Sequence, residues 1–156
     1  MVRMKPLRYS TVFFLTAMMI SALRADPLKV GDQAPAITGI TETGQPLAFA
    51  SVYPKGYTLV YFYPKAETPG CTAEGCSLRD AFQDLSDRGV TVIGVSADTV
   101  AEQRAFKEKY HFPFTLIADH DRKVINAFGV PVYAAMGFAH RQSFLIDKDG
   151  KSVWCD

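Results

Sequence analysis

The sequence predicts an α/β domain in which a mixed β-sheet lies between helices. Three runs of β-branched and aromatic residues, at positions 57–63, 90–97 and 114–119, have the length of buried strands. Segments with apolar residues at helical spacing alternate with these runs, and two shorter strand-like segments follow near the end of the chain. The 156 residues, 48% of them hydrophobic, suffice for one such domain.

The segment before the first long strand is expected to form a hairpin. Residues 30–52 are rich in Gly, Pro and Thr, with turn signals at residues 43–46, and such punctuation joins short extended pieces. The strand at residues 57–63 is apolar or aromatic at nearly every position and ends at Pro64. Because such a strand is buried on both faces, we expect it in the middle of the sheet.

Helical periodicity predicts two helices in the middle of the chain. From about residue 71 to residue 87, apolar residues recur at steps of three and four, and Gly89 is a natural stop. A second helix is expected over residues 99–111, with Asp98 or Thr99 as its N-cap. Each of these helices would connect two strands of the sheet.

The last part of the chain is expected to hold a short helix and a second hairpin. Residues 122–130 form the helical segment, which ends at Gly129. Residues 141–147 and 151–156 are strand-like, and the Asp-Lys-Asp-Gly turn at 147–150 joins them. We find no internal repeat, low-complexity tract or linker.

The first 25 residues have the composition of an export signal. A basic start precedes the apolar run of residues 12–23, and small residues near Ala25 mark a cleavage site. The apolar run is shorter than the roughly 18 residues that usually span a bilayer, so we expect no stable membrane span. The expectation is an exported, periplasmic domain of residues 26–156, with an uncleaved anchor as the alternative.

The charge balance argues against a nucleic-acid partner. Four of the 17 Lys and Arg residues, and none of the 16 Asp and Glu residues, lie in the first 25 residues. The remaining chain is therefore mildly acidic. It has no basic stripe that could follow a phosphate backbone, so we expect no nucleic-acid binding.

The chemistry is concentrated in the segment Tyr61–Asp80, which contains two of the three cysteines. Cys71 lies where strand gives way to helix, and the unpaired N–H groups and helix dipole there favour a thiolate over a thiol. Thr68 can direct its hydroxyl at the sulfur, while Pro64 and Pro69 stiffen the loop. We therefore expect Cys71 to be nucleophilic.

Cys76 follows Cys71 by five residues on the same predicted helix. In a regular helix their Cα atoms would be roughly 8 to 9 Å apart, whereas a disulfide needs less than about 7 Å. A bond between them requires the first turns to unwind, which suits a reversible redox pair better than a structural staple. The alternatives are a packing role and a metal site with His111, His120 or His140, although no second cysteine pair at zinc-motif spacing exists.

The phrase Phe-Tyr-Pro-Lys-Ala-Glu-Thr-Pro-Gly-Cys-Thr-Ala-Glu-Gly-Cys resembles the active-site segment of the peroxiredoxins. The second cysteine, five residues after the first, is similar to that of the peroxiredoxin Q, or bacterioferritin comigratory protein, subgroup. The resemblance runs from about Gly31 to Lys151. It implies a thioredoxin fold with a peroxiredoxin-type N-terminal hairpin, and a thioredoxin-dependent peroxiredoxin that reduces hydrogen peroxide and organic hydroperoxides.

The resemblance also implies a role for each site residue. Cys71 would be the peroxidatic nucleophile and Cys76 the resolving cysteine, while Pro64 would shield the sulfur, Thr68 would hydrogen-bond the peroxide and Arg141 would reach in from a later strand. A guanidinium there would stabilise the thiolate and polarise the peroxide bond. The implied cycle passes through a sulfenic acid and a disulfide, which a thioredoxin-like dithiol reduces. It requires no metal, haem or flavin cofactor, and we expect a monomer or weak dimer.

The end of the sequence departs from the family's pattern. Family members continue beyond this point with the rest of a strand and a C-terminal helix that packs on the sheet. Either the sequence is a truncated or frameshifted product, or one apolar sheet face is bare and must be covered by another subunit. Cys155 has no counterpart in the motif. The alternatives are an intermolecular thiol, an alternative resolving thiol and a residue without a role.

Two other functional classes use the same cysteines. One is a non-catalytic redox sensor that passes its disulfide to a partner. The other is a thiol:disulfide exchange protein, which the absence of a Cys-x-x-Cys sequence disfavours.

Overall fold

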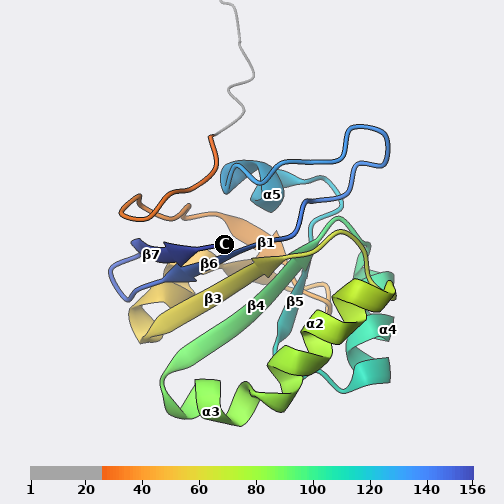
Figure 1. Ribbon diagram of the computed structural model, residues 1–156, viewed down its shortest axis with the longest axis horizontal. Coiled ribbons are helices and arrows are strands. Elements are labelled where there is room, and N and C mark those ends of the chain that lie inside the picture. The colour runs from red at the N-terminus through yellow and green to blue at the C-terminus, as the bar shows by residue number, and fades with distance from the viewer. Residues whose placement is uncertain (1–25) are drawn as a thin grey trace, which may run out of the picture.

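A five-stranded mixed sheet organises residues 26–156, which are the residues that the computed structural model describes (Figure 1). The strands lie in the order β5-β4-β3-β6-β7. Their bounds are Tyr57–Phe62 for β3, Val90–Ser96 for β4, Thr115–Ala118 for β5, Gln142–Ile146 for β6 and Ser152–Cys155 for β7. Because β3 pairs in parallel with β4 and antiparallel with β6, it occupies the centre, as its apolar sequence predicts. The expected export signal, residues 1–25, lies outside the described residues.

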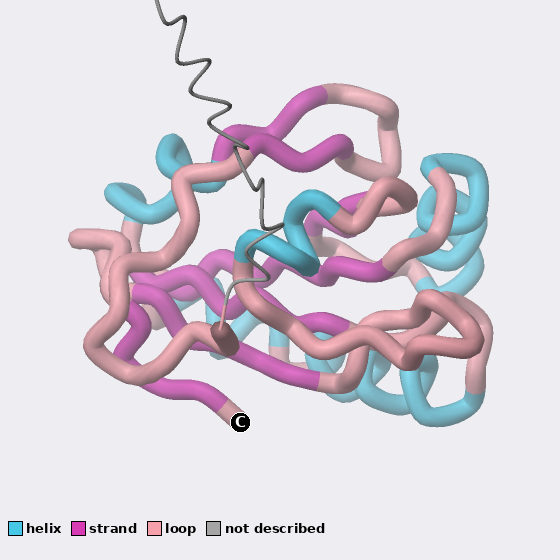
Figure 2. The backbone as a smooth tube through the Cα atoms, turned by 90° about the horizontal axis from the view of Figure 1, so that it is seen from above, coloured by secondary structure: helices cyan, strands magenta, loops and turns pink. Residues whose placement is uncertain are grey.

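Helices cover both faces of the sheet. Their bounds are Phe49–Val52 for α1, Pro69–Asp80 for α2, Phe82–Asp87 for α3, Val100–Tyr110 for α4 and Lys123–Ala127 for α5. Helices α2, α3 and α4 lie on one side, whereas α5 lies on the other, where Figure 2 shows it over the sheet. None of the helices among the described residues is long and apolar enough to cross a membrane.

The N-terminal hairpin is present, and a short helix follows it. Strand β1, Thr38–Ile40, pairs antiparallel with β2, Pro46–Ala48. Directly after β2 the chain forms α1, which was not expected from the sequence because a single helical turn has no periodicity to detect. Its buried residues, Phe49 and Val52, are three positions apart and therefore point to the same side of the turn.

The prediction of one continuous helix over residues 71–87 is wrong in its bounds. The structure has two helices, and the first already begins at Pro69. Between them Ala81 has φ −88° and ψ −1°, outside ordinary helical geometry. The break lets Phe82, the first residue of α3, pack on Phe114, which directly precedes β5; their ring centroids are 6.2 Å apart. No Gly or Pro marks this point in the sequence.

The later elements agree with the sequence pattern. Thr99, rather than Asp98, is the N-cap of α4, where it forms a capping box with Glu102. The chain leaves α5 through Gly129, whose φ of +67° lies in the left-handed region that glycine tolerates. Strands β6 and β7 form the expected terminal hairpin.

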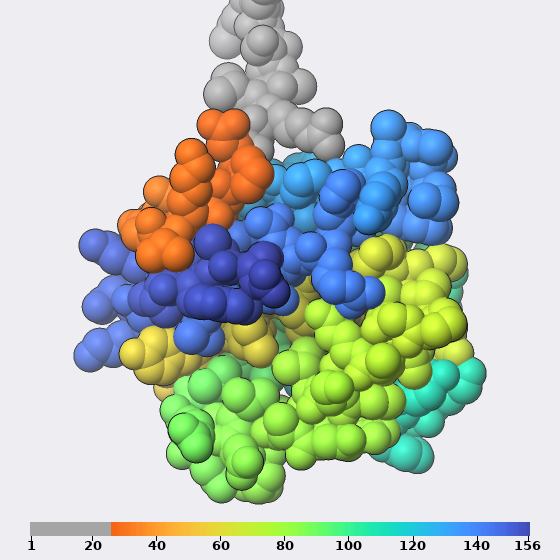
Figure 3. All heavy atoms as spheres, viewed as in Figure 1, coloured from red at the N-terminus to blue at the C-terminus, as the bar shows by residue number. Residues whose placement is uncertain are grey.

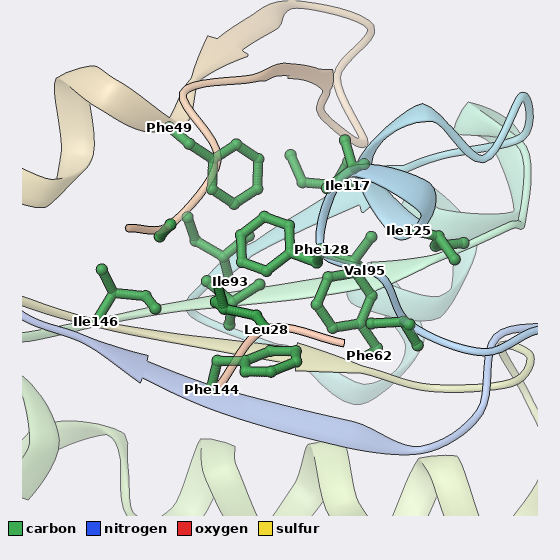
Figure 4. Close-up of a cluster of buried hydrophobic side chains, with 14 of the residues drawn as sticks. Leu28, Phe49, Phe62, Ile93, Val95, Ile117, Ile125, Phe128, Phe144 and Ile146 are labelled. Atoms are coloured by element: carbon green, nitrogen blue, oxygen red, sulfur yellow. The ribbon is translucent and has the colours of Figure 1, made fainter. Parts of the chain in front are cut away.

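Two hydrophobic clusters fill the space on either side of the sheet. Phe62 points into the first cluster with Phe128 and Phe144 (Figure 4). Its neighbours Tyr61 and Tyr63 point the other way, into a second cluster. The other buried members of that cluster are Ala66, Cys71, Val92, Phe106, Phe112, Phe114 and Leu116. The alternation along β3 therefore places Cys71 in a different core from the one that supports the hairpin.

Part of the sheet face on the side of α2 is open to solvent. Trp154 of β7 is 46% exposed and lies opposite Leu145 of β6, which in turn lies opposite Leu59 of β3. These cross-strand neighbours share one face. Figure 3 shows the atoms of β7 at the surface beside the helices.

Candidate active site

The site forms around the first turn of α2. Thr68 is extended, with φ −79° and ψ 148°, and Pro69 at the first helical position starts the helix because its φ is already set. Cys71 therefore lies in the first turn. No side chain caps that turn, since the Thr68 hydroxyl instead donates to the carbonyl of Lys65 at 2.9 Å. The N–H groups of the turn are free of a side-chain acceptor and suited to an anion.

Arg141 lies against the sulfur of Cys71. Its Nη2 is 3.4 Å from Sγ, a distance at which an N–H donates to sulfur. Cys71 is 2% exposed, whereas the side chain of Arg141 is 43% exposed, so the cation reaches a buried sulfur from the solvent side. Near a buried sulfur a cation stabilises negative charge more than it does in bulk water. Gly70 leaves space for the guanidinium, because a Cβ there would lie 3.3 Å from Nη2.

Glu74 is the second partner of Arg141. Its carboxylate forms an ion pair with Nη1, so one guanidinium joins the sulfur to a carboxylate one helical turn later. Burial raises the pKa of Glu74 above its ordinary 4.5, and the charge of Arg141 offsets only part of this effect. The sequence motif did not mark Glu74, because its partner lies 67 residues away in sequence.

Pro64 and Thr68 lie half-buried in the loop that precedes α2. Between them Glu67 adopts φ +64°, a left-handed conformation that is uncommon for a residue with a side chain. The loop is thus sharply bent, which brings the Thr68 hydroxyl back to the Lys65 carbonyl. The structure gathers four of the predicted site residues, Pro64, Thr68, Cys71 and Arg141, around the start of α2.

Cys76, the fifth predicted site residue, is a half-buried free thiol in the same helix as Cys71. Between the two cysteines Gly75 is buried against the ring of Phe112. The two sulfurs cannot bond while α2 keeps its regular form, because the helix separates the Cα atoms too widely. Cys155 packs against the first hydrophobic cluster and so lies on the other side of the sheet from Cys71.

The surroundings of the three histidines weighed as metal ligands differ from one another. His111 and His120 are exposed, and His140 stacks on Tyr133 with ring centroids 3.9 Å apart. Within residues 26–156 there is no group of three or more His, Cys, Asp or Glu side chains that could hold a metal ion.

Comparison with known proteins places the chain in a family. The model of the AhpC/TSA family matches residues 30–154, and this match covers most of the chain. The chain belongs to this family: it is a peroxiredoxin. A peroxiredoxin Bcp of Escherichia coli is 43% identical over 131 residues, which cover 81% of this chain and 83% of the relative. A putative peroxiredoxin bcp of Coxiella burnetii is 40% identical over 137 residues, covering 81% of this chain and 88% of the relative.

Solved structures of the same subgroup share the fold. Peroxidoxin BcpB from Mycobacterium tuberculosis matches with a TM-score of 0.78 and 30% identity, covering 83% of this chain and 85% of that one. A mutant of peroxiredoxin Q from Xanthomonas campestris matches with a TM-score of 0.72 and 27% identity, over 85% and 87% of the two chains. The predicted thioredoxin-like fold, the Bcp/peroxiredoxin Q subgroup and the enzyme class, a thioredoxin-dependent peroxiredoxin, are therefore confirmed.

Proposed function

We propose that this peroxiredoxin reduces hydrogen peroxide and small organic hydroperoxides, with Cys71 as the attacking thiolate and Cys76 as the resolving thiol. The observation that carries the proposal is the 3.4 Å contact between Arg141 Nη2 and Cys71 Sγ at the uncapped start of α2. A cation and free N–H groups at one sulfur are suited to hold a thiolate and a peroxide oxygen together.

In the first step the Cys71 thiolate attacks the terminal oxygen of the hydroperoxide. An S–O bond forms and the O–O bond breaks; the sulfur is oxidised to a sulfenic acid and the peroxide is reduced. The leaving alkoxide or hydroxide takes up a proton to become an alcohol or water. Arg141 and the N–H groups of the first turn stabilise the negative charge that grows on that oxygen, while Thr68 orients the peroxide.

In the second step α2 unwinds and the Cys76 thiol attacks the sulfenic sulfur. An S–S bond forms, the S–O bond breaks and water leaves. A thioredoxin-like dithiol then donates two electrons and two protons, which returns both thiols and leaves the partner as a disulfide. The separation of the two cysteines along a regular helix is the reason that unwinding must precede the disulfide.

The test is peroxide consumption by the purified chain with thioredoxin and its reductase. We expect many turnovers for the wild type and none for Cys71→Ser. Cys76→Ser should rapidly consume one equivalent of peroxide and then stop, because thioredoxin does not regenerate it. Cys155→Ser is the matched control, since that thiol lies in the other core, and it should keep wild-type turnover. A folded wild type that consumes about one equivalent per chain would favour the redox sensor. Reduction of a disulfide substrate without peroxide would favour the exchange protein.

We also propose that the enzyme is exported to the periplasm. The support is the basic start and apolar run within residues 1–25. Cell fractionation and N-terminal sequencing test it: a periplasmic chain beginning at Asp26 is expected. A membrane-bound chain with Met1 retained would mean an uncleaved anchor, and a cytosolic one would contradict export. The reductant must lie on the same side of the membrane.

A further inference from the structure

A buried carboxylate holds the loop in front of Cys71. Asp98, two residues beyond β4, is 4% exposed. Its Oδ2 accepts hydrogen bonds from the backbone N–H of Ala66 at 2.8 Å and from the hydroxyl of Ser96 at 2.7 Å. Its Oδ1 lies 3.1 Å from Nζ of Lys65. Two of its partners therefore belong to the loop between Pro64 and Thr68.

Further buried hydrogen bonds connect this carboxylate to the other end of the same loop. The Gln103 amide, fully buried in α4, donates to the Ser96 hydroxyl at 2.8 Å and to the Ile117 carbonyl at 2.9 Å. Its oxygen accepts from the hydroxyl of Tyr63, which directly precedes Pro64. We call Tyr63, Gln103, Ser96 and Asp98 the buried polar chain. Its hydrogen bonds hold the loop at Tyr63 and again at Lys65 and Ala66.

The loop needs such an external restraint. Glu67 is held at φ +64°, which for a residue with a side chain is unfavourable unless its surroundings impose it. The Thr68 hydroxyl is positioned by the carbonyl of Lys65, and the Lys65–Ala66 segment is positioned in turn by Asp98. Asp98 is thus connected to Thr68 through the Lys65–Ala66 segment, whereas no hydrogen bond joins it to Cys71.

We propose that Asp98 is a positioning residue of the peroxidatic step: it fixes the loop of residues 64–68 over the sulfur, and keeps it there while α2 unwinds. The proposal rests on the proposed function, because it assigns Asp98 to the peroxide-binding arrangement of Thr68 and Cys71. It differs from a role in thiol activation, since the cation beside the sulfur comes from Arg141 on another element.

The experiment compares two reactions of Cys71 in the full chain. The first is the rate of the single reaction with hydrogen peroxide, which needs a correctly placed loop. The second is alkylation by iodoacetamide over a range of pH, which reports the thiolate without needing the peroxide site. For Asp98→Ala we expect the peroxide rate to fall about 100-fold, the loss typical of a misplacement near 1 Å. The alkylation profile should stay within about threefold of the wild type.

Two further variants sharpen the result. Asp98→Asn keeps an oxygen for the Ala66 N–H and the Ser96 hydroxyl, and should recover most of the lost peroxide rate. Glu102→Gln is the matched control: Glu102 also contacts Lys65, at 3.3 Å, but its side chain is 47% exposed. Glutamine retains the capping oxygen, so this variant should keep the wild-type peroxide rate.

Hydrogen exchange of the Ala66 amide gives a readout that does not depend on peroxide. In Asp98→Ala this amide should exchange about tenfold faster, because it loses its hydrogen bond to a charged acceptor. Unchanged exchange, or an unchanged peroxide rate in the folded variant, would overturn the proposal. Equal losses in peroxide reaction and alkylation would also overturn it, in favour of thiol activation. If Asp98→Ala does not fold, Asp98→Leu, which fills the space without offering an acceptor, takes its place: a wild-type exchange of Ala66 together with a wild-type peroxide rate in that variant would decide against the proposal.

The wild type in the same assay separates the two proposals. A wild type without peroxide reaction would refute the proposed function. The exchange of Ala66 would still show whether Asp98 holds the loop.

Discussion

The two segments that flank Cys71 are held very differently. On its N-terminal side the loop of residues 64–68 is tied to β4 and α4 by the buried polar chain. On its C-terminal side, α2 buries Cys71 and Gly75 and no larger residue completely. One side of the cysteine is therefore built to stay in place, whereas the other can be released.

The sequence of α2 supports this difference. The helix carries Gly75 in its interior, and a glycine there disfavours the helical state by about 1 kcal/mol relative to alanine. Its links to the rest of the molecule include the ion pair of Glu74 and the bond from Arg79 Nη1 to the Tyr110 carbonyl at 2.9 Å. Only modest interactions would therefore have to be broken when α2 unwinds in the resolving step.

A substitution in the restrained loop of residues 64–68 should reduce the peroxide rate most. Thr68→Val removes the hydroxyl and keeps the shape, so the peroxide loses a polar partner and the loop loses its bond to Lys65. We expect the peroxide rate to fall about 100-fold, as for a misplaced substrate, because the peroxide loses the hydroxyl oxygen that accepts its O–H and the loop is no longer held. Stopped-flow kinetics of the first turnover measure it. Thr68→Ser should restore the rate, and a Thr68→Val variant as fast as the wild type would remove Thr68 from the site.

Overpacking at Gly75 should destabilise α2. A Cβ on Gly75 would lie 2.6 Å from Cζ of Phe112, too close for either group to stay in place. Overpacking of this kind typically destabilises by about 1–3 kcal/mol, and the better helix propensity of alanine offsets about 1 kcal/mol of it. Gly75→Ala should lower the urea midpoint and speed disulfide formation between Cys71 and Cys76. A higher midpoint would mean that Phe112 moves away freely.

The third prediction weakens α2 without any clash. Ala73 is exposed on α2, and Ala73→Gly disfavours the helix by about 1 kcal/mol. If unwinding limits the resolving step, disulfide formation after one equivalent of peroxide should be about fivefold faster. The preceding reaction with peroxide should change little, because the loop of residues 64–68 is untouched. An unchanged rate of disulfide formation would mean that release of α2 is not limiting.

The strands and most helices of this fold could be predicted because their signals are local. The apolar run of β3 and the helical periodicity of α4 lie within single segments. The sequence narrows the N-cap of α4 to Asp98 or Thr99, and the structure decides for Thr99. The break at Ala81 could not be predicted, because it depends on the fit of Phe82 against the distant Phe114.

The same distinction applies to the site. Cys71 and Thr68 are identifiable from one short motif, and Arg141 only through the resemblance to the peroxiredoxins. Glu74 and Asp98 are not, because their importance appears only when the fold brings Arg141 to α2 and the loop to β4. Asp98 had a competing local explanation as a helix cap, which the structure assigns to Thr99 instead.

The smallest expected effect concerns the ion pair that joins α2 to Arg141. Burial raises the pKa of Glu74, so the folded protein holds this proton more tightly than the unfolded chain does. The contribution of Glu74 to the free energy of unfolding is therefore complete at pH values below the ordinary glutamate pKa of 4.5. It is lost as the pH rises through the raised pKa of the folded state. Glu74→Gln cannot titrate. The stability of the wild type relative to this variant should fall with rising pH, by less than about 1 kcal/mol.

Urea unfolding of both proteins, from below pH 4.5 to neutrality, measures this slope. Arg79→Gln is a suitable control, since it removes another link of α2, the bond to Tyr110, without touching Glu74. The opposite slope, with the wild type gaining on Glu74→Gln as the pH rises, would mean that the attraction of Arg141 outweighs the burial of the carboxylate. In that case the ion pair would hold α2 to the sheet at neutral pH, and breaking it would belong to the cost of releasing Cys71.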